Sequence, residues 1–491
     1  MTEQDEQRTS REHKLEQLAG LGLPYLPNTF PDARSSESVH SQYGALEGTR
    51  VRVAGRLMRV RLMGKAAFAH IQDRDGQLQL YFKLDVIGAT KWEYFKLLDI
   101  GDIVGAEGSV FRTRTGEVTV QVEDFVLLAK AYRSLPDKWH GITDVEVRYR
   151  RRYLDLISNE DARRIAKLRS TLVRCVRSYL DARGFVEVET PVLQPVYGGA
   201  AATPFTTHYR TLEMQAFLRI SDELYLKRLI VGGLERVYEI GKDFRNEGVS
   251  RKHSPEFTML ELYQAYADYH DVMALTEDMI AEAAQHTVGT RILSYDDVEI
   301  DLTPPWRRLS MQDAIREESG ADIYAPDARE QLRAVAAQRN VKIDPDGSRG
   351  KLVEEIFGAL IEPKLISPTF IFDHPVDFPG SLLAKRSAAN PEAAERFEPY
   401  VAGMELGNAF TEVNEPGDQR ARMEEAAHLS GEEHQEMDTD YLLALEHGMP
   451  PTGGLGLGID RLAMLLSGAH HIREVILFPL LRQREDENAE S

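Results

Sequence analysis

Hydrophobic positions recur every second residue between residues 50 and 128, which is the period of half-buried β-strands. Short strands are predicted at Arg50–Leu57, Phe68–Gln72, Gln77–Phe82, Ile103–Phe111 and Val118–Leu128. Asp75-Gly76 and Thr115-Gly116 supply the turns of two hairpins, and a short helix is predicted at Lys91–Leu98. Five short strands and one helix in about 80 residues indicate a small closed barrel of the OB type.

Barrels of this type bind single-stranded nucleic acid by stacking bases on aromatic rings beside basic side chains. Phe68, with Arg61 and Gln79 nearby in the strand pattern, is the candidate for such a contact. The alternative is that Phe68 belongs to the barrel core and that Arg61 is simply solvated.

The hydrophobic period becomes helical after residue 160. Apolar residues from Ile165 to Leu180 share one face of a predicted helix over Asp161–Arg183, and Gly184 is placed to end it. Strands follow, and they are predicted at Phe185–Pro191, Leu234–Ile240, Glu256–Tyr263 and Pro368–Phe372. Gly453–Arg461 enters a further helix, with Arg461 in its first turn. Strands and helices in this order indicate an α+β domain.

Charged side chains crowd the polar loop between the strands at Leu234–Ile240 and Glu256–Tyr263. These side chains are Arg245, Glu247, Arg251, Lys252 and His253. Arginine presents a planar fork to phosphate oxygens, and lysine and histidine add further donors. Cations held beside carboxylates suit a nucleotide and its metal ions, but a solvated hairpin with ordinary surface ion pairs fits the same pattern. Glu223, at the start of a predicted helix, is likewise explained by the helix dipole alone.

The composition is that of a folded protein of two or three domains, with 491 residues and 42% hydrophobic residues. The single cysteine excludes an internal disulfide and a cysteine metal cluster. No apolar run is long enough for a membrane span, and the polar N-terminus is unlike a signal peptide, so a cytoplasmic protein is expected. The net charge of −20 argues against nucleic-acid binding, yet basic residues cluster at Arg50–Lys65 and Arg148–Arg152 and leave local contacts open.

The pattern predicts an N-terminal extension (1–48), a barrel (49–132), a linker (133–160), a large domain (161–482) and an acidic tail (483–491). Residues from about 307 to 363 are predicted to form a helical insertion in the large domain. No chemistry is predicted for this insertion.

Three stretches resemble the signatures of one enzyme family. Phe244-Arg-Asn-Glu-Gly, followed by His253-Ser-Pro-Glu-Phe-Thr-Met-Leu-Glu261, looks like the second signature of class II aminoacyl-tRNA synthetases. The helix, Gly184-Phe185, the strand and Thr190-Pro191 resemble the first signature, and Gly454–Arg461 with Arg473–Pro479 resembles the third. From about Arg50 to Arg482 the chain is similar to the bacterial-type lysyl-tRNA synthetases of class IIb.

The resemblance implies an OB-fold anticodon-binding barrel followed by an antiparallel catalytic sheet flanked by helices, in a homodimer. It implies lysine and ATP as substrates, Mg²⁺ with the ATP, and tRNA(Lys) as partner. Arg245 and Arg461 are the implied catalytic residues. The implied ATP-binding residues are Arg245, Glu247, Lys252, His253, Phe257, Glu398, Glu405 and Arg461. Glu398 and Glu405 are also the implied metal ligands, because a hard cation prefers oxygen.

The same resemblance assigns a lysine site. Its implied residues are Gly199, Glu223, Arg245, Glu261, Tyr263, Asn408, Phe410, Glu412 and Gly456. Glu223 and Glu412 match the two positions that hold the substrate side chain, as a buried ammonium requires. Arg61, Phe68 and Gln79 match the positions that read the central anticodon uridine. The chain departs from the family pattern at Thr203, Lys252 and Gly380–Leu383.

Two other functions compete with lysine–tRNA ligation. A related lysyl or aminoacyl transferase that modifies a protein would lack the barrel, so residues 50–128 argue against it. A non-catalytic RNA-binding paralogue is opposed by intact Arg245, Glu398, Glu405 and Arg461.

Overall fold

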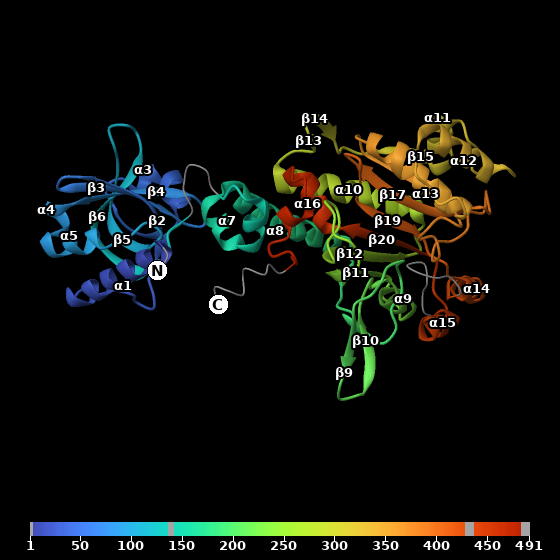
Figure 1. Cartoon of the computed structure of the whole chain (residues 1–491), viewed down its shortest axis with the longest axis horizontal. Coiled ribbons are helices and arrows are strands. Elements are labelled where there is room, and N and C mark those ends of the chain that lie inside the picture. The colour runs from blue at the N-terminus through green and yellow to red at the C-terminus, as the bar shows by residue number, and fades with distance from the viewer. Residues whose placement is uncertain (1–2, 136–141, 428–436, 483–491) are drawn as a thin grey trace. The chain divides into compact units, whose positions relative to one another are not determined.

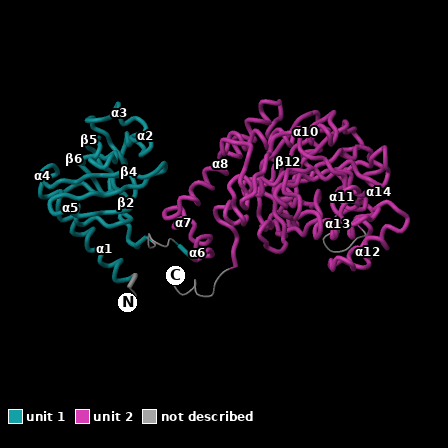
Figure 2. Tube along the Cα trace, turned by 90° about the horizontal axis from the view of Figure 1, so that it is seen from above, with its two compact units in different colours: residues 1–143 teal, residues 144–491 magenta. Residues whose placement is uncertain are grey.

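The computed structural model describes residues 3–135, 142–427 and 437–482. Two compact units, residues 1–143 and 144–491, make up the chain (Figure 2). The acidic tail predicted at 483–491 lies outside the described residues. Among the described helices, none is both long enough and apolar enough to span a membrane.

Unit 1 is a closed barrel of five strands, in which β2 pairs with β5 and thereby joins the two ends of the sheet. The strands are β2 (Arg50–Met63), β3 (Ala66–Gln72), β4 (Gln77–Lys83), β5 (Ile103–Arg112) and β6 (Val118–Ala129), with a short β1 (Ala33–Arg34) beside β2. Helices α4 (Leu84–Ile87) and α5 (Ala89–Lys96) follow β4. The predicted alternation is confirmed, since residues 67, 69 and 71 of β3 point into the core and 68 and 70 point outward.

The segment before the barrel folds onto it. Helix α1 (Glu3–Gly20) contributes Leu18, which is 1% exposed, and α2 (Ser36–Ser41) contributes Val39 to the core of the barrel. Helix α3 (Tyr43–Leu46) leads into β2. The segment therefore has no separate core and depends on the barrel for its burial.

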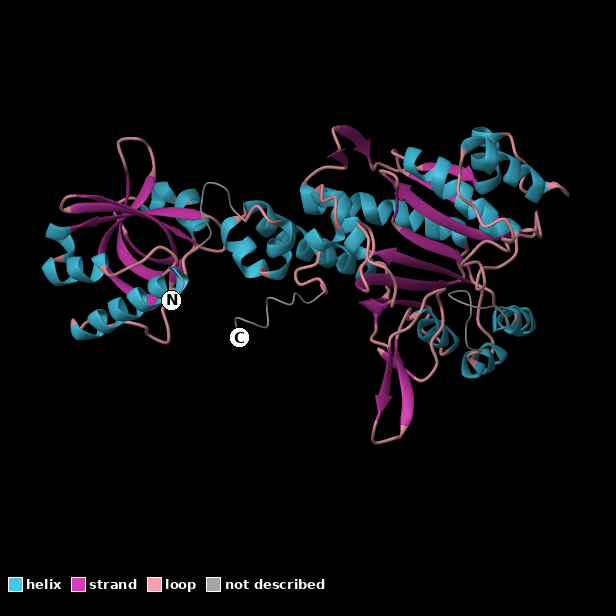
Figure 3. Cartoon of the chain, in the orientation of Figure 1, coloured by secondary structure: helices cyan, strands magenta, loops and turns pink. Residues whose placement is uncertain are grey.

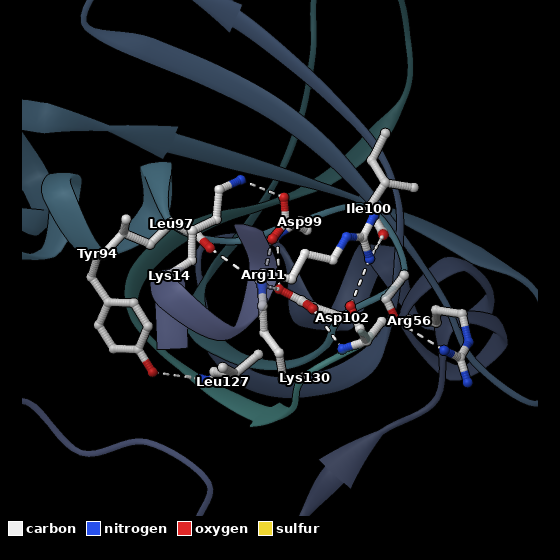
Figure 4. Close-up of polar contacts among 12 residues, drawn as sticks. Arg11, Lys14, Arg56, Tyr94, Leu97, Asp99, Ile100, Asp102, Leu127 and Lys130 are labelled. Carbon is white, nitrogen blue, oxygen red and sulfur yellow. Dashed lines mark hydrogen bonds and ion pairs between the residues drawn. The ribbon is translucent and has the colours of Figure 1, made fainter. Parts of the chain in front are cut away.

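A buried lysine stabilises this end of the barrel (Figure 4). The Lys130 ammonium is 1% exposed and donates to Asp99 at 2.6 Å and to Asp102 at 2.8 Å. From α1, Lys14 pairs with the other oxygen of Asp99 at 2.5 Å, and Arg11 donates to the carbonyl of Ala131. A buried charge requires such partners, so the cluster ties the first helix to the end of β6.

Unit 2 is built around a nine-stranded sheet with the order β15-β16-β17-β19-β20-β12-β11-β7 and β18 beside β17 (Figures 1 and 3). Its strands are β7 (Val186–Glu187), β11 (Arg236–Phe244), β12 (Glu256–Ala265), β15 (Arg307–Ser310), β16 (Thr369–Pro375), β17 (Ala393–Val401), β18 (Met404–Glu405), β19 (Gly407–Thr411) and β20 (Thr452–Gly458). The pairs at the two ends are parallel and the others are antiparallel. The α+β fold is thus confirmed, although the strand predicted at Phe185–Pro191 is only two residues long.

Different helices pack against the two faces of the large sheet. Helices α8 (Glu160–Asp181), α10 (Tyr269–Val288) and α16 (Ile459–Ser467) share a core with Leu260 and Leu262 of β12. Helices α9 (Glu223–Val231) and α15 (Thr439–Glu446) share another core with Tyr263 of the same strand. Helix α14 (Pro416–Ala427) packs against α15. Alternation along β12 therefore directs Glu261 and Tyr263 to the face away from α8 and α10.

Smaller elements complete unit 2. The second sheet has the order β8 (Leu193–Gln194), β10 (Met214–Leu218) and β9 (Thr206–Tyr209), and β13 (Ile292–Tyr295) pairs with β14 (Val298–Asp301). The β9–β10 hairpin extends away from the large sheet (Figure 1). Residues 307–363, predicted as a helical insertion, begin with strand β15 and continue as α11 (Met311–Ser319), α12 (Ala328–Arg339) and α13 (Arg349–Leu360). A short 3-10 helix (Glu362–Lys364) follows, and α17 (Ile472–Val475) lies near the C-terminus.

Part of the predicted linker belongs to unit 2, which begins at residue 144. Helices α6 (Val145–Arg150) and α7 (Arg152–Ser158) occupy it. Arg152 is 2% exposed and donates to the carbonyls of Leu477 and Arg473 and to Asp155. Arg152, the last residue of the basic cluster Arg148–Arg152, therefore ties α7 to the C-terminal segment.

Candidate active site

A cavity of about 410 Å³ opens on the sheet face away from α8 and α10. Its wall includes sixteen residues singled out from the sequence: Gly199, Glu223, Arg245, Glu247, Lys252, His253, Phe257, Glu261, Tyr263, Glu398, Glu405, Asn408, Phe410, Glu412, Gly456 and Arg461. These residues come from segments more than 250 positions apart, and antiparallel pairing of β12, β20, β19 and β17 brings them together.

One part of the cavity wall is anionic. Glu223, at the first residue of α9, and Glu412, directly after β19, are 6% and 1% exposed. Both form ion pairs with Lys227, which is fully buried; the contact to Glu223 is 2.5 Å. Burial raises the pKa of Glu412 well above its ordinary value, although Lys227 opposes this shift. A further cation near Glu223 and Glu412 would therefore stabilise the ionised form of the two carboxylates.

Glu261 lies beside this pair and is 7% exposed. Burial, together with the nearby charges of Glu223 and Asp243, raises the pKa of Glu261 to about 8, while a hydrogen bond from the Tyr263 hydroxyl at 3.0 Å opposes the rise. Glu261 is thus protonated at neutral pH in the empty cavity. A neutral carboxyl next to two carboxylates limits the repulsion among them.

Glycines leave room for these carboxylates. A Cβ at Gly456 would lie 2.6 Å from Glu261 Oε1, and one at Gly454 would lie 2.2 Å from Glu412 Oε1. Gly199 has φ +86 and faces the Cβ of Glu223. Side chains at these positions would displace the acids, so the glycines shape the cavity.

Arg245 and Phe257 form another part of the wall. The Arg245 guanidinium carbon lies 5.1 Å from the centroid of the Phe257 ring, within cation–π distance. The backbone N–H of Arg245 donates to the carbonyl of Pro255 at 2.9 Å, which closes the loop between β11 and β12. Glu247 is exposed in this loop. The solvated-hairpin alternative does not hold for Arg245, because its guanidinium is half-buried at the cavity.

Arg461 and His253 meet across the cavity mouth. Arg461 donates to His253 Nε2 at 3.1 Å, and His253 Nδ1 lies 2.7 Å from Ser250 Oγ. Partial burial and then the charges of Arg461, Arg245 and Lys252 lower the pKa of His253 to about 4. The imidazole is therefore neutral, with Nε2 as an acceptor that orients Arg461. Arg461 also donates to the carbonyl of Glu405 at 2.8 Å.

Two carboxylates of the cavity wall, Glu398 and Glu405, are candidate ligands for a metal ion. Glu398 accepts from Arg396 and from the Tyr400 hydroxyl, each at 2.6 Å, one on each oxygen. Burial would raise the pKa of Glu398, but Arg396 and His374 outweigh it and lower the pKa to about 2. Each oxygen keeps a free lone pair, and the Glu405 side chain is 37% exposed at the same wall. Burial raises the pKa of Glu405, and a hard cation held by both carboxyl groups would favour their ionised form.

Other predicted residues are held by neighbours. Lys252 Nζ donates to Glu362 at 3.0 Å and to the carbonyl of Gly403 at 2.7 Å. Asn408 Oδ1 accepts from Arg396 Nε at 2.8 Å. In the stretch that departs from the family pattern, the carbonyl of Pro379 and the Ser381 hydroxyl accept from the same guanidinium. The altered stretch therefore still supports the wall of the cavity, and Thr203 contributes its carbonyl to Asn246.

Sequence reasoning missed Arg396 and Lys227, the two cations that hold the carboxylates. Arg396 lies two residues before Glu398 on β17, so strand alternation places it on the same face. Lys227 lies four residues after Glu223 on α9, the spacing at which helix side chains meet. Both spacings are visible in the sequence, but only the fold reveals that the pairs are buried.

The residues predicted to contact nucleic acid lie on strands β2, β3 and β4 of the barrel in unit 1, and Gln79 among them is buried. Arg61 is opposite Phe68 in the β2–β3 register, and the Phe68 ring lies 4.8 Å from that of Tyr81. Phe68 is half-buried and lies outside the barrel core, so the core alternative is not supported. Gln79 donates to Glu117 at 2.7 Å and accepts from Thr119 at 2.8 Å.

Comparison with known proteins also distinguishes the barrel from the larger unit. Residues 144–482 match the family described as tRNA synthetases class II (D, K and N), and residues 51–128 match the OB-fold nucleic acid binding domain. The chain therefore belongs to the class II tRNA synthetases of this group, and the resemblance seen in the sequence is confirmed.

Particular relatives are similar over nearly their whole length. A protein of Moorella thermoacetica named lysine–tRNA ligase is 50% identical over 479 residues, covering 97% of this chain and 98% of its own length. A protein of the same name from Pelotomaculum thermopropionicum is 50% identical, covering 97% of this chain and 94% of its own length. Another from Bacillus cereus is 48% identical and covers 99% of both chains.

The raised pKa of Glu261 predicts a stability that falls as pH rises. The folded protein keeps a proton, up to about pH 8, that an unfolded chain releases near the ordinary value of 4.5. Between these values the free energy of unfolding decreases by up to about 1.4 kcal/mol per pH unit. Glu261→Gln removes this titration, so its melting temperature relative to wild type should increase from about pH 5 to pH 8 in calorimetry. Parallel curves for the two proteins would contradict the assignment.

Proposed function

We propose that this protein is a lysine–tRNA ligase that activates L-lysine with ATP and transfers it to the 3′ end of tRNA(Lys). The observation that carries the proposal is a single cavity with buried carboxylates, Glu223 and Glu412, and arginines, Arg245 and Arg461, in its wall. Carboxylates suit the substrate ammonium and arginines suit a triphosphate. The names of the relatives support the same activity.

In the proposed first step the lysine carboxylate attacks the α-phosphorus of ATP, and pyrophosphate leaves. The substrate is itself the nucleophile, so no catalytic base is required. Arg245 binds the α-phosphate and the carboxylate, Phe257 stacks on the adenine, and Arg461 binds the outer phosphates. Glu247, Lys252 and His253 contact the nucleotide. Catalysis then rests on in-line positioning and on stabilising charge at phosphorus.

In the second step the terminal hydroxyl of the tRNA attacks the carbonyl carbon of the lysyl-adenylate, and AMP leaves. Mg²⁺ accompanies ATP in this proposal, and Glu398 and Glu405 would hold it through their oxygens. The ion would neutralise phosphate charge when bound. Glu261, Tyr263, Asn408, Phe410, Gly199 and Gly456 complete the lysine site. We place the reaction in the cytoplasm, where tRNA and ATP meet.

Neutralising either anionic anchor should weaken lysine activation. For Glu223→Gln or Glu412→Gln we expect lysine-dependent ATP–pyrophosphate exchange to fall at least about tenfold in kcat/KM, or about 1.4 kcal/mol, because one charge-assisted contact to the ammonium is lost. Glu299→Gln, an exposed acid on β14, is the matched control. Unchanged exchange in both variants would reject Glu223 and Glu412 as anchors of the substrate ammonium. A wild type that shows exchange with another amino acid and not with lysine would reject lysine as the substrate.

The barrel should act on the tRNA step alone. Phe68→Ala removes a proposed stacking platform, worth about 1–3 kcal/mol per base, so kcat/KM for charging of tRNA(Lys) should fall about tenfold or more. Tyr25→Ala changes an exposed aromatic residue outside the Phe68–Tyr81 stack and is the control. ATP–pyrophosphate exchange should be unaffected in both variants. Equal losses in charging and in exchange would argue against a role for Phe68 in tRNA binding.

We further propose a homodimer that uses the surface around α8 and the C-terminal segment. Leu477, Phe478 and Leu480 are 45%, 69% and 66% exposed and line a groove with residues of α8 such as Val173. Val186 and Leu193, which follow α8 in the chain, are also exposed. Exposed apolar groups gathered in this way are typical of a protein interface.

A charge placed in this groove should separate the subunits. For Phe478→Asp we expect the dimer dissociation constant, measured by sedimentation, to rise at least about tenfold, because the interface must then bury a carboxylate. Tyr266→Asp, at a residue that is 70% exposed and does not line the groove, is the control. A wild type that sediments as a monomer at micromolar concentration would contradict the proposal.

A further inference from the structure

Lys227 is a charged residue of the site with no assigned role. It lies on α9, one turn after Glu223, and its side chain is fully buried. The ammonium pairs with Glu223 Oε1 at 2.5 Å and with Glu412 Oε2. It lies 5.4 Å from the Phe410 ring centroid and 5.9 Å from those of Tyr263 and Tyr441. Lys227 thus occupies a complete cation site between the two acids.

This ammonium contacts the acids from outside the cavity. Glu223, Glu412, Tyr263 and Phe410 all line the cavity, whereas Lys227 is absent from its described wall. Lys227 takes Oε2 of Glu412, and Oε1 of the same carboxylate accepts no hydrogen bond within the described part of the chain. Oε1 is buried against Gly454 of the cavity wall, where an added Cβ would lie 2.2 Å from it. Because Glu223 and Glu412 line the cavity and Lys227 does not, a second cation in the cavity approaches the acids from the side opposite Lys227.

Further titratable groups face this ammonium from two other elements and from the residue before its own helix. Glu261 and Tyr263 come from β12, Tyr441 from α15, and Asp222 precedes α9. Burial alone would lower the pKa of Lys227, but Glu223 and Glu412 outweigh burial and raise it, so Lys227 remains an ammonium. With Glu261 protonated, full ionisation of Glu223 and Glu412 beside the Lys227 ammonium gives a net charge of −1, and burial, which raises the pKa of both acids, opposes this state in the empty site.

We propose that Lys227 is a positioning and specificity-determining residue that reduces the charge of the Glu223–Glu412 pair to that of one carboxylate. The proposal rests on the proposed function. A net charge of −1 matches a substrate side chain with a single ammonium, and the filled site is then neutral. In the empty site burial favours uptake of one proton, which the substrate ammonium replaces one for one.

Without Lys227 the two acids would have to be neutralised by two protons. A singly charged substrate replaces only one of these protons. If the second proton leaves, an uncompensated negative charge is buried; if it stays, it occupies an oxygen that would otherwise accept a hydrogen bond from the substrate. Lys227 therefore allows both carboxylates to be ionised once the substrate ammonium is bound. It also holds one oxygen of each in a fixed place, which directs the other oxygens to the cavity.

The test compares wild type with Lys227→Met, which keeps the length of the side chain and removes its charge. Lysine-dependent ATP–pyrophosphate exchange is measured from about pH 6 to pH 9. We expect the variant-to-wild-type ratio of KM for lysine to be at least about tenfold near pH 7, to increase at lower pH and to decrease toward pH 9, with kcat changed less. Titration of lysine itself, and of groups unaffected by the substitution, largely cancels in the ratio.

A second variant separates charge from packing. The double variant that combines Lys227→Met with Glu412→Gln keeps one of the two carboxylates. We expect its KM for lysine to stay high, but the ratio of this KM to that of wild type should no longer depend on pH. Lys130→Met removes a buried ammonium between two carboxylates of unit 1 and is the control for lost burial, with an unchanged KM for lysine.

The outcomes separate the two proposals. A KM ratio for Lys227→Met that is equal at every pH, or close to one, would overturn the role of Lys227 while leaving lysine activation in place. A wild type without lysine-dependent exchange would overturn the proposed function, and the role of Lys227 with it. Circular dichroism and melting temperature establish that each variant is folded.

Discussion

Charged side chains buried on one face of the large sheet must find partners, because an isolated ion in a protein interior is strongly unfavourable. Lys227, Arg396 and Arg219 are three of the buried cations of unit 2 that meet this requirement. Lys227 pairs with Glu223 and Glu412, Arg396 holds Glu398 at 2.6 Å, and Arg219 holds Glu239 at 2.6 Å and Asp243 at 3.2 Å. Glu223, Glu412, Arg396 and Glu398 line the cavity, so these fixed charges contribute both to its shape and to its electrostatic field.

In the proposed function, this arrangement separates the lysine side chain from the triphosphate within the cavity. Among the described residues the buried acids are not fully paired, since Glu412 Oε1 accepts no hydrogen bond and Glu261 is protonated at neutral pH. Arg245 and Arg461 stand at a half-buried wall where a triphosphate can keep part of its hydration. The charges of the site are fixed before the α-phosphate is attacked, so they do not have to rearrange during the reaction. Such preorganisation suits a reaction that needs no protein base.

The sequence predicted the elements well where periodicity was strong and one side of the element was buried. The barrel strands, α8 and the strands around residues 240–263 follow the alternation of their residues. The sixteen cavity residues were inferred from motif resemblance and lie together as expected. Prediction failed where tertiary contacts decided the outcome. Arg152 lies in a basic run that is typical of a solvated surface, yet backbone carbonyls of the C-terminal segment bury it.

The sequence by itself determined the two-part organisation, the family signatures and the chemical types available to the site, because these depend on local period and residue identity. Only the tertiary structure decided which charges are buried and which partners they share. Glu223 and Lys227 are neighbours on α9, but Glu412 reaches them only through the pairing of β19 with β20 and β17. Burial is a property of the whole packed sheet and its helices, so spacing along the chain cannot reveal it.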